Sequence, residues 1–309
     1  MNDTHTFNTH TLNNSNINSQ SIKPVTFNLG SLQLHGLSFG HEQDPILLCI
    51  HGWLDNAASF QSLIPLIKNR YVIAIDLSGH GFSSHKTPDA HYHFIDWVYD
   101  LLKLSEHNQW KAIDVVGHSM GAMISCAFAA AFPEKVKSLT LIDAIGFITT
   151  HAEDTTAQLR KGMLSRFKSE APPTATFTDD SVKQPKKSHS RQSAINARVM
   201  VSDLSIEHAS ILVDRGLIKE GQGYIWRTDS RLRNVSPYRL TPLQADNIVK
   251  NIQCPVQVIY GDKGMHMAVA GIKHYSPMLP QLTSHALVGG HHVHMEQTEQ
   301  TAVLINGFI

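Results

Sequence analysis

The sequence has little cysteine and no excess of charge of either sign. Its three cysteines, Cys49, Cys126 and Cys254, lie in apolar runs and lack the spacing of a disulfide framework or a zinc site. We therefore expect buried free thiols and a reducing compartment. Lys and Arg number 26, as do Asp and Glu, so the formal net charge of the 309 residues is zero. Without a basic excess, nothing favours a nucleic acid as partner.

Long apolar runs are also missing. No stretch approaches the roughly 18 apolar residues of a membrane-spanning helix, and the N-terminus lacks the basic start and apolar stretch of a signal peptide. We expect a soluble, cytoplasmic protein without a membrane partner. Residues 1–22 are mostly Asn, Thr, Ser, His and Gln, and such a segment cannot offset its ordering entropy by burying apolar surface. A disordered polar tail is therefore predicted there.

The next part of the chain alternates strands and helices. Several of its strands are continuous apolar runs, which is typical of parallel strands buried on both faces. The regular alternation predicts a mostly parallel, doubly wound sheet flanked by helices. Strands are predicted at 24–29, 32–39, 45–50, 71–75, 113–116 and 136–142, and helices at 57–67, 92–104 and 120–132.

The alternation stops after residue 146 and resumes near residue 241. The stretch between is polar and mainly helical in pattern, with a loop rich in Pro, Thr and Lys at 171–187. Two parts, 23–146 and 241–309, are therefore predicted to form one α/β core, and 147–240 to form a helical cap inserted between them. In the second part we expect helices at 242–250 and 269–275, strands at 256–260 and 284–288, and a final helix.

The strongest chemical motif is Gly117-His118-Ser119-Met120-Gly121. A bare G-x-S-x-G match is weak, but here a predicted strand precedes it and a predicted helix follows. A nucleophile elbow needs this arrangement, because the glycines allow the sharp turn that exposes the serine hydroxyl. The helix N-terminus adds partial positive charge at the site. We identify Ser119 as the candidate nucleophile.

An oxyanion hole requires two backbone N–H groups that converge on the developing negative charge. His51-Gly52-Trp53 ends an early strand, and Met120 directly follows the candidate nucleophile. We expect the N–H groups of Trp53 and Met120 to fill this role, with the Trp53 ring as a wall of the acyl pocket. A glycine-containing stretch at 76–83 also follows a strand, and there a structural role is favoured over a catalytic one.

The candidate general base lies after the last predicted strand, in Gly289-Gly290-His291-His292-Val293-His294. A loop in this place can bring an imidazole within hydrogen-bond reach of the serine. We favour His291, with His292 as the alternative. His292 and His294 also have the spacing of metal ligands, but no second cluster stands out to complete a site, so no metal is predicted.

The triad acid has two candidates. On this type of sheet the acid comes between the serine and the histidine in chain order. Asp262 lies in the loop after the next-to-last strand, and Asp143 ends the strand that follows the serine helix. Asp143 is favoured because its carboxylate should emerge at the same sheet edge as Ser119, where open α/β sheets bind their ligands.

These motifs resemble those of the α/β-hydrolase superfamily, from about residue 24 to the C-terminus and weakly across the cap. The decapeptide HGWLDNAASF at 51–60 is similar to the equivalent stretch of the serine hydrolase-like proteins. Residues 83–85, 226–229 and 291–295 support the same resemblance. It implies the α/β-hydrolase fold, a helical cap and Ser119 as nucleophile, and it implies little about the substrate.

The resemblance also bears on the chemistry and on the acid. Epoxide hydrolases and haloalkane dehalogenases of this superfamily use an aspartate at the elbow, so the serine at 119 argues against both activities. Many relatives carry the triad acid two positions after Asp262, where this chain has Gly264. Some dehalogenases carry it at the strand end that corresponds to Asp143. The choice between Asp143 and Asp262 stays open at this point.

The sequence therefore predicts a serine hydrolase that cleaves a small carboxylic ester or thioester through an acyl-enzyme. Neither an organic cofactor nor a metal is expected, and the expected partner is a small-molecule acyl substrate. The same triad could instead serve an acyltransferase or a C–C hydrolase, which product analysis would distinguish. A non-catalytic binding protein on a hydrolase scaffold is the alternative from another class, because fold alone does not fix function.

Overall fold

The computed structural model describes residues 21–170 and 190–309. The predicted loop at 171–187 and all but the last two residues of the predicted tail lie outside these ranges.

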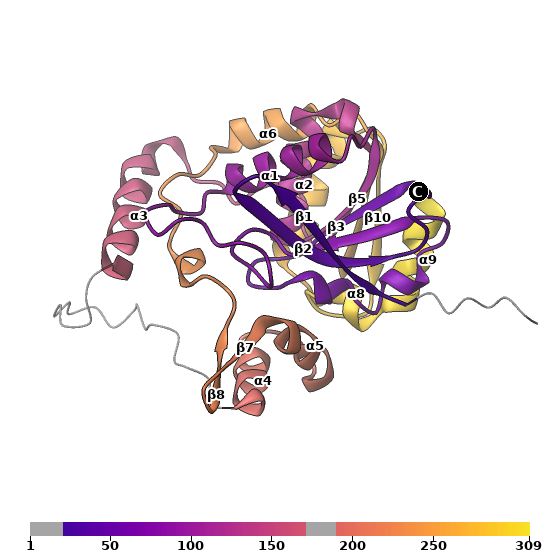
Figure 1. Ribbon diagram of the computed structural model, residues 1–309. Coiled ribbons are helices and arrows are strands. Elements are labelled where there is room, and N and C mark those ends of the chain that lie inside the picture. The colour runs from indigo at the N-terminus through magenta and orange to yellow at the C-terminus, as the bar shows by residue number, and fades with distance from the viewer. Residues whose placement is uncertain (1–20, 171–189) are drawn as a thin grey trace, which may run out of the picture.

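The core is an eight-stranded sheet with the strand order β1-β2-β4-β3-β5-β6-β9-β10 (Figure 1). Its first two pairings, β1 with β2 and β2 with β4, are antiparallel, and the remaining ones are parallel. The strands are β1 Lys23–Leu29, β2 Leu32–Phe39, β3 Ile46–Ile50, β4 Tyr71–Ile75, β5 Ile113–His118, β6 Val136–Ile142, β9 Val256–Gly261 and β10 Leu282–Leu287. This confirms the predicted α/β-hydrolase fold.

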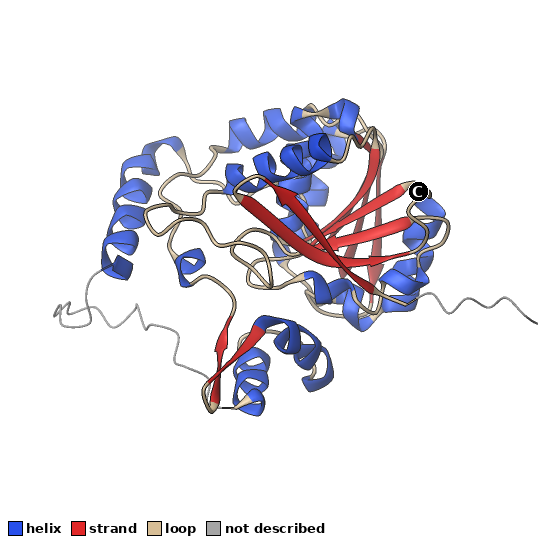
Figure 2. Cartoon of the chain, in the orientation of Figure 1, coloured by secondary structure: helices blue, strands red, loops and turns tan. Residues whose placement is uncertain are grey.

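Helices cover both faces of this sheet, which is why its central strands are apolar throughout (Figure 2). One face packs against helices α1, α2, α6 and α7 through a large cluster that includes Trp97, Phe128 and Val249. The other face packs against helices α8 and α9 and two short 3₁₀ turns, with Phe60 and Ile305 in that cluster. The helices are α1 Phe94–His107, α2 Met120–Ala131, α6 Pro242–Lys250, α7 His266–Tyr275, α8 Val293–Glu296 and α9 Thr298–Phe308.

Two local predictions were wrong. The helix expected at 57–67 is a pair of 3₁₀ turns, η1 Ala57–Phe60 and η2 Ile64–Leu66, because Pro65 lacks the N–H that a continuous helix would need. The stretch after residue 216, expected to be mainly helical, contains the hairpin of β7 Leu217–Glu220 and β8 Gly223–Trp226. Its turn uses Gly221 at φ 59°, and its Tyr, Ile and Trp residues favour strands over helices.

The segment between β6 and α6 contacts the loops at the carboxyl edge of the sheet. It contains α3 Thr155–Glu170, α4 Arg191–Met200 and α5 Ile206–Gly216, drawn outside the sheet in Figure 1. Helices α4 and α5 share a third apolar cluster that includes Leu212 and Met295. Asn56 after β3 donates to the carbonyl of Leu212, and Arg215 pairs with Asp76 after β4.

No described helix is long and apolar enough to cross a bilayer. The three cysteines are free thiols: Cys49 and Cys126 are buried as predicted, and Cys254 is only partly buried.

Candidate active site

Ser119 lies on a strained turn between strand β5 and helix α2. Its backbone has φ 53° and ψ −115°, a conformation that residues other than glycine rarely adopt. A Cβ on Gly117 would lie 2.6 Å from the carbonyl oxygen of Gly121, and one on Gly121 would lie 2.1 Å from that of Ile50. Both glycines of the motif are therefore required by close backbone approach, and the turn holds the Ser119 side chain at the start of the helix.

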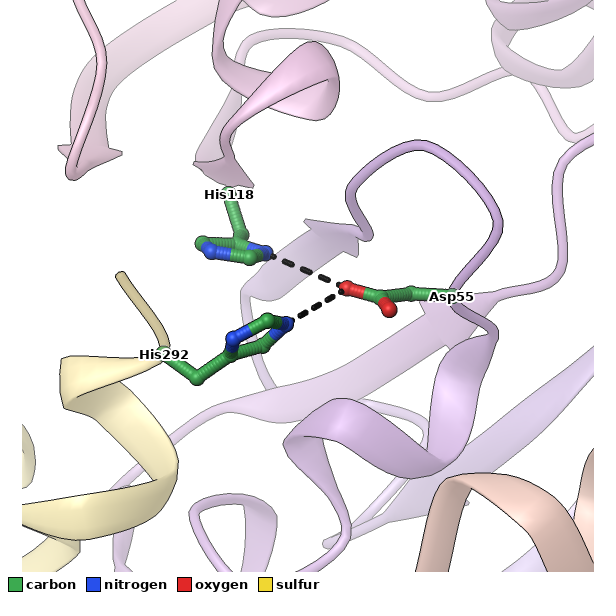
Figure 3. Close-up of side chains that lie close together, drawn as sticks. All are labelled: Asp55, His118 and His292. Carbon is green, nitrogen blue, oxygen red and sulfur yellow. Dashed lines mark hydrogen bonds and ion pairs between the residues drawn. The ribbon is translucent and has the colours of Figure 1, made fainter. Parts of the chain in front are cut away.

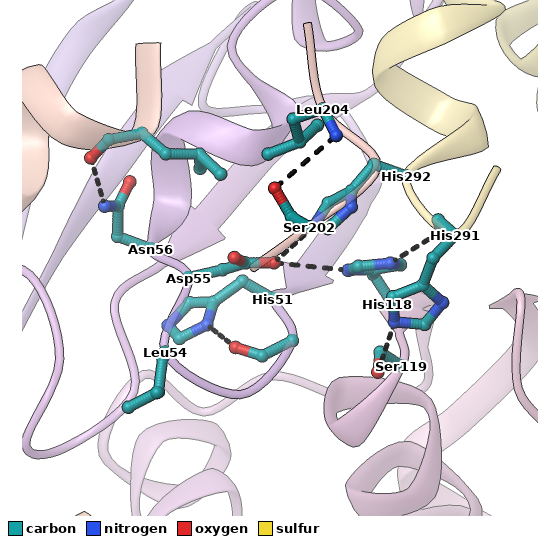
Figure 4. A network of polar contacts seen from close by, with 12 residues as sticks. His51, Leu54, Asp55, Asn56, His118, Ser119, Ser202, Leu204, His291 and His292 are labelled. Atoms are coloured by element: carbon teal, nitrogen blue, oxygen red, sulfur yellow. Dashed lines mark hydrogen bonds and ion pairs between the residues drawn. The ribbon is translucent and has the colours of Figure 1, made fainter. Parts of the chain in front are cut away.

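His291 lies in the loop after β10 and contacts the serine directly. Its Nε2 is 2.8 Å from Ser119 Oγ, and its Nδ1 is 2.7 Å from Asp143 Oδ2 (Figure 4 shows the first contact). A carboxylate only accepts hydrogen bonds, so Nδ1–H donates to Asp143 and the Nε2 lone pair accepts the serine hydroxyl proton. The structure thus brings Ser119, His291 and Asp143 together in the order that nucleophilic catalysis requires.

Asp143 directly follows strand β6 and is fully buried. Besides His291, its carboxylate accepts hydrogen bonds from the backbone N–H groups of Gly261 at 3.2 Å and Met265 at 2.9 Å. A Cβ on Gly264 would lie only 2.2 Å from Asp143 Oδ1. Many relatives carry the triad acid at the position of Gly264. In this chain the Asp143 carboxylate occupies the space that a side chain at 264 would need, which explains the glycine.

Asp262, the alternative acid, and His292, the alternative base, bind other groups. Asp262 accepts a hydrogen bond from the backbone N–H of Gly289 at 2.9 Å and so connects the loop after β9 to the loop that carries His291. His292 points away from Ser119, with its Nδ1 2.9 Å from Asp203 Oδ1. Among the described residues, His291 makes the contact with Ser119 that a general base would make, and Asp143 makes the contact with His291 that a triad acid would make.

The two predicted oxyanion donors lie on neighbouring segments, because the first turn of α2 packs against the end of β3 at Gly121. Met120 is the first residue of α2, so its N–H has no partner within the helix. Trp53 is half exposed, and its indole N–H donates to the carbonyl of Leu232 at 3.0 Å. The Trp53 ring therefore connects this loop to the segment inserted after β6. The oxyanion role of both residues stays a prediction.

Sequence reasoning missed a charged group behind His291. The backbone N–H of His291 donates to Asp203, which lies between α4 and α5. Asp203 also accepts from His292, whose other ring nitrogen faces buried Asp55. Burial opposes charge on His292, but Asp55 and Asp203 outweigh it and raise its pKa to about 9. No local motif could have identified Asp203, since it lies 88 residues from His291 in the chain.

Asp76, in the stretch at 76–83, makes structural contacts. It is fully buried, accepts from the backbone N–H groups of Ala57 at 2.8 Å and Phe82 at 2.9 Å, and pairs with Arg215 at 2.7 Å. A Cβ on Gly81 would lie 2.3 Å from its carboxyl carbon. These contacts support the structural role that the sequence favoured.

Among the described residues, one group combines metal-ligand side chains at short range: Asp55, His118 and His292. This set differs from the pair that the sequence spacing offered, because His294 is not part of it. The His294 ring instead packs against Phe60, with ring centroids 5.1 Å apart.

Comparison with known proteins gives consistent matches. The model of the alpha/beta hydrolase fold family matches residues 45–298. The serine hydrolase-like protein of Danio rerio is 28% identical over 286 residues, which cover 90% of this chain and 85% of that protein. A hypothetical protein from Pseudomonas aeruginosa PAO1 has a similar structure, with 32% identity, a TM-score of 0.80 and coverage of 92% of this chain and 97% of that one. The thioesterase domain from the curacin biosynthetic pathway is 26% identical, with a TM-score of 0.77 and coverage of 92% and 99%.

Proposed function

Since the chain belongs to the alpha/beta hydrolase family and is a hydrolase, we propose that it cleaves small carboxylic esters or thioesters through an acyl-enzyme on Ser119. One observation carries the proposal: an unbroken hydrogen-bonded series from Ser119 Oγ through the His291 imidazole to Asp143. Its two contacts are 2.8 and 2.7 Å long. Such a series activates a hydroxyl that is otherwise a weak nucleophile at neutral pH.

In the first half of the reaction, Ser119 Oγ attacks the carbonyl carbon of the substrate while His291 Nε2 takes the hydroxyl proton. Negative charge then develops on the carbonyl oxygen, and the N–H groups of Trp53 and Met120 stabilise it. The imidazolium of His291 gives its proton to the departing alcohol or thiol. Asp143 holds the Nδ1–H tautomer and balances the transient positive charge.

In the second half, a water molecule takes the place of the departing group. His291 removes a proton from it as its oxygen attacks the acyl carbon, and then returns that proton to Ser119 Oγ as the acyl bond breaks. The products are a carboxylic acid and the free serine. Three donors hold the Asp143 carboxylate in place throughout.

The acyl-enzyme can be tested with a fluorophosphonate probe and intact mass measurement. We expect one adduct on the wild type and none on Ser119→Ala. Ser125→Ala is a matched control, because Ser125 lies in the same helix with its hydroxyl bonded to the carbonyl of Gly121 at 2.7 Å. The control should label as the wild type does. Equal labelling of the wild type and Ser119→Ala would refute the assignment of the nucleophile.

The substrate class needs a separate experiment. The similarity to a thioesterase domain makes thioesters a specific candidate beside oxygen esters. Turnover of p-nitrophenyl esters of graded acyl length should be compared with turnover of the matching acyl thioesters, whose thiol product is measured with a chromogenic reagent. A fast release of one equivalent of nitrophenol before steady state would show that the acyl-enzyme accumulates. Absence of turnover on both series would contradict the proposed substrate class.

A further inference from the structure

Three buried side chains from separate parts of the chain point toward one another (Figure 3). Asp55 comes from the loop after β3, His118 from the end of β5 and His292 from the loop after β10. All three are buried, and one ligand atom of each lies within 4.8 Å of those of the other two. Asp55 Oδ2 is 3.5 Å from His118 Nδ1 and 3.3 Å from His292 Nε2.

The hydrogen bonds of His118 leave one ring nitrogen without a partner. Its Nε2 is 3.0 Å from the carbonyl oxygen of His291, which can only accept, so in the neutral ring the proton lies on Nε2. Its Nδ1 is buried without a hydrogen bond in the described structure, and its lone pair faces a carboxylate oxygen. Two acceptors that face each other call for a cation between them.

His292 and Asp55 are also held by outer hydrogen bonds that leave one ligand atom directed into the cluster. His292 Nδ1 is 2.9 Å from Asp203 Oδ1, which leaves Nε2 directed at Asp55. Arg198 binds Asp55 Oδ1, which leaves Oδ2 for the cluster. Each histidine thus has an oxygen acceptor on its outer nitrogen, which is the arrangement that orients histidine ligands in metal sites.

The distances within the cluster also agree with the spacing of ligands around one metal ion. A hydrogen bond between an imidazolium and a carboxylate is typically about 2.7–2.9 Å long. Ligand atoms about 2.0–2.2 Å from a tetrahedral metal are separated by about 3.3–3.6 Å. The two contacts of Asp55 Oδ2, 3.3 and 3.5 Å, fall in the second range.

We propose that Asp55 Oδ2, His118 Nδ1 and His292 Nε2 bind a divalent transition-metal ion such as Zn²⁺ or Co²⁺. Nitrogen and carboxylate ligands in a tetrahedral arrangement suit these ions. Arg198 pairs with Asp55, and Asp203 pairs with the outer nitrogen of His292, so both carboxylates around the site are held in place. When the metal binds, the Nε2 proton of His292 passes to the solvent, which frees the lone pair for the metal.

The site is separate from the acyl chemistry but touches its loop. His118 directly precedes Ser119, and its Nε2–H holds the carbonyl of His291. A bound metal would therefore fix the loop of the proposed base without contacting the substrate. Metal binding should survive the loss of the nucleophile, so it can be measured on Ser119→Ala independently of any hydrolase activity.

The experiment is a titration of the chelator-treated full chain with Co²⁺, followed by visible absorption, and with Zn²⁺, followed by calorimetry. We expect one tight equivalent with the intense bands of tetrahedral Co²⁺ in the wild type and in Ser119→Ala. His292→Gln and Asp55→Asn should lose it, with affinity lowered by more than the about 10- to 100-fold that an outer-shell partner is worth. His274→Gln is the matched control for adventitious binding, because the half-exposed His274 is paired with Asp246 at 2.7 Å and should leave the tight equivalent unchanged.

Two results would overturn the proposal. One is an equal stoichiometry and affinity in the wild type, His292→Gln and Asp55→Asn. The other is a wild type that shows only the weak bands of octahedral Co²⁺. The second result decides the matter on the wild type alone, so the proposal stays testable if circular dichroism shows that either ligand variant fails to fold.

Discussion

Replacing Asp143 with asparagine separates a catalytic from a structural role for this buried carboxylate. The side chains have the same shape, but asparagine keeps one acceptor oxygen and gains an NH₂ group. In the native structure three donors point at the carboxylate: His291 Nδ1–H and the backbone N–H groups of Gly261 and Met265. In the variant one of these donors must face the NH₂ group, or His291 must adopt the other tautomer.

The size of the effect follows from these contacts. With the other tautomer, Nε2 carries a proton and cannot accept the one on Ser119. The loss of turnover in such a case is about 10⁴-fold, which corresponds to about 5.4 kcal/mol in the activation barrier. The stability cost is smaller, about 1–3 kcal/mol, because one buried donor loses its acceptor. Asp143→Asn should therefore stay folded and be almost inactive.

Asp262→Asn is the matched control, since the same chemical change is made at the other candidate acid. Asp262 is exposed and accepts one hydrogen bond, from the N–H of Gly289, which an asparagine oxygen can also accept. We expect near wild-type turnover and a change in stability within about 0.5 kcal/mol. Ester turnover and melting temperature should be measured for both variants. If Asp262→Asn were inactive and Asp143→Asn active, the identification of the acid would be wrong.

A double variant extends this test. Gly264→Asp alone should be disruptive, because its Cβ would lie 2.2 Å from Asp143 Oδ1. Asp143→Gly empties that space, and glycine suits the backbone at position 143, where φ is 49°. The double variant should therefore be more active than Asp143→Gly by at least about tenfold, a clear departure from additivity. Equal activity of the two would show that a carboxylate at 264 cannot reach His291.

Three further predictions concern parts of the fold outside the triad. Arg215→Ala should lower the free energy of unfolding by about 3–5 kcal/mol, measured by urea denaturation, because it leaves the buried carboxylate of Asp76 unpaired; a loss below about 1 kcal/mol would contradict this. Burial opposes ionisation of Asp229, but Arg231 holds its pKa below the usual value, so its stabilising effect is present above about pH 4 and is lost as the pH falls through the lower folded pKa. The stability deficit of Asp229→Asn should thus shrink in acid, and a constant deficit would refute this. Burial raises the pKa of the Cys254 thiol to about 11, so alkylation near about pH 8 should be slow until the protein unfolds, and rapid native labelling would contradict that reason.

Much of the fold could be predicted because its signals are local. The apolar runs that became β3, β4, β5 and β6 are buried on both faces, and this property is visible in the sequence without any contact. Ser119 and His291 could be nominated for the same reason, since each lies in a glycine-containing loop directly after a strand. The hairpin of β7 and β8 was missed because it is short and lies in a polar region with helices on its N-terminal side.

The acid could not be decided from the sequence, because both candidates end a strand at the same edge of the sheet. Asp143 and Asp262 follow or lie next to the ends of neighbouring strands, and only the three-dimensional structure shows which carboxylate faces His291. Yet the deciding residue was visible as a departure from the family pattern, Gly264. A side chain at 264 and a carboxylate at 143 would occupy the same space, since the Cβ of one would lie 2.2 Å from the oxygen of the other. The two positions are therefore mutually exclusive, and a glycine at 264 together with an aspartate at 143 is the combination that favours Asp143 as the acid.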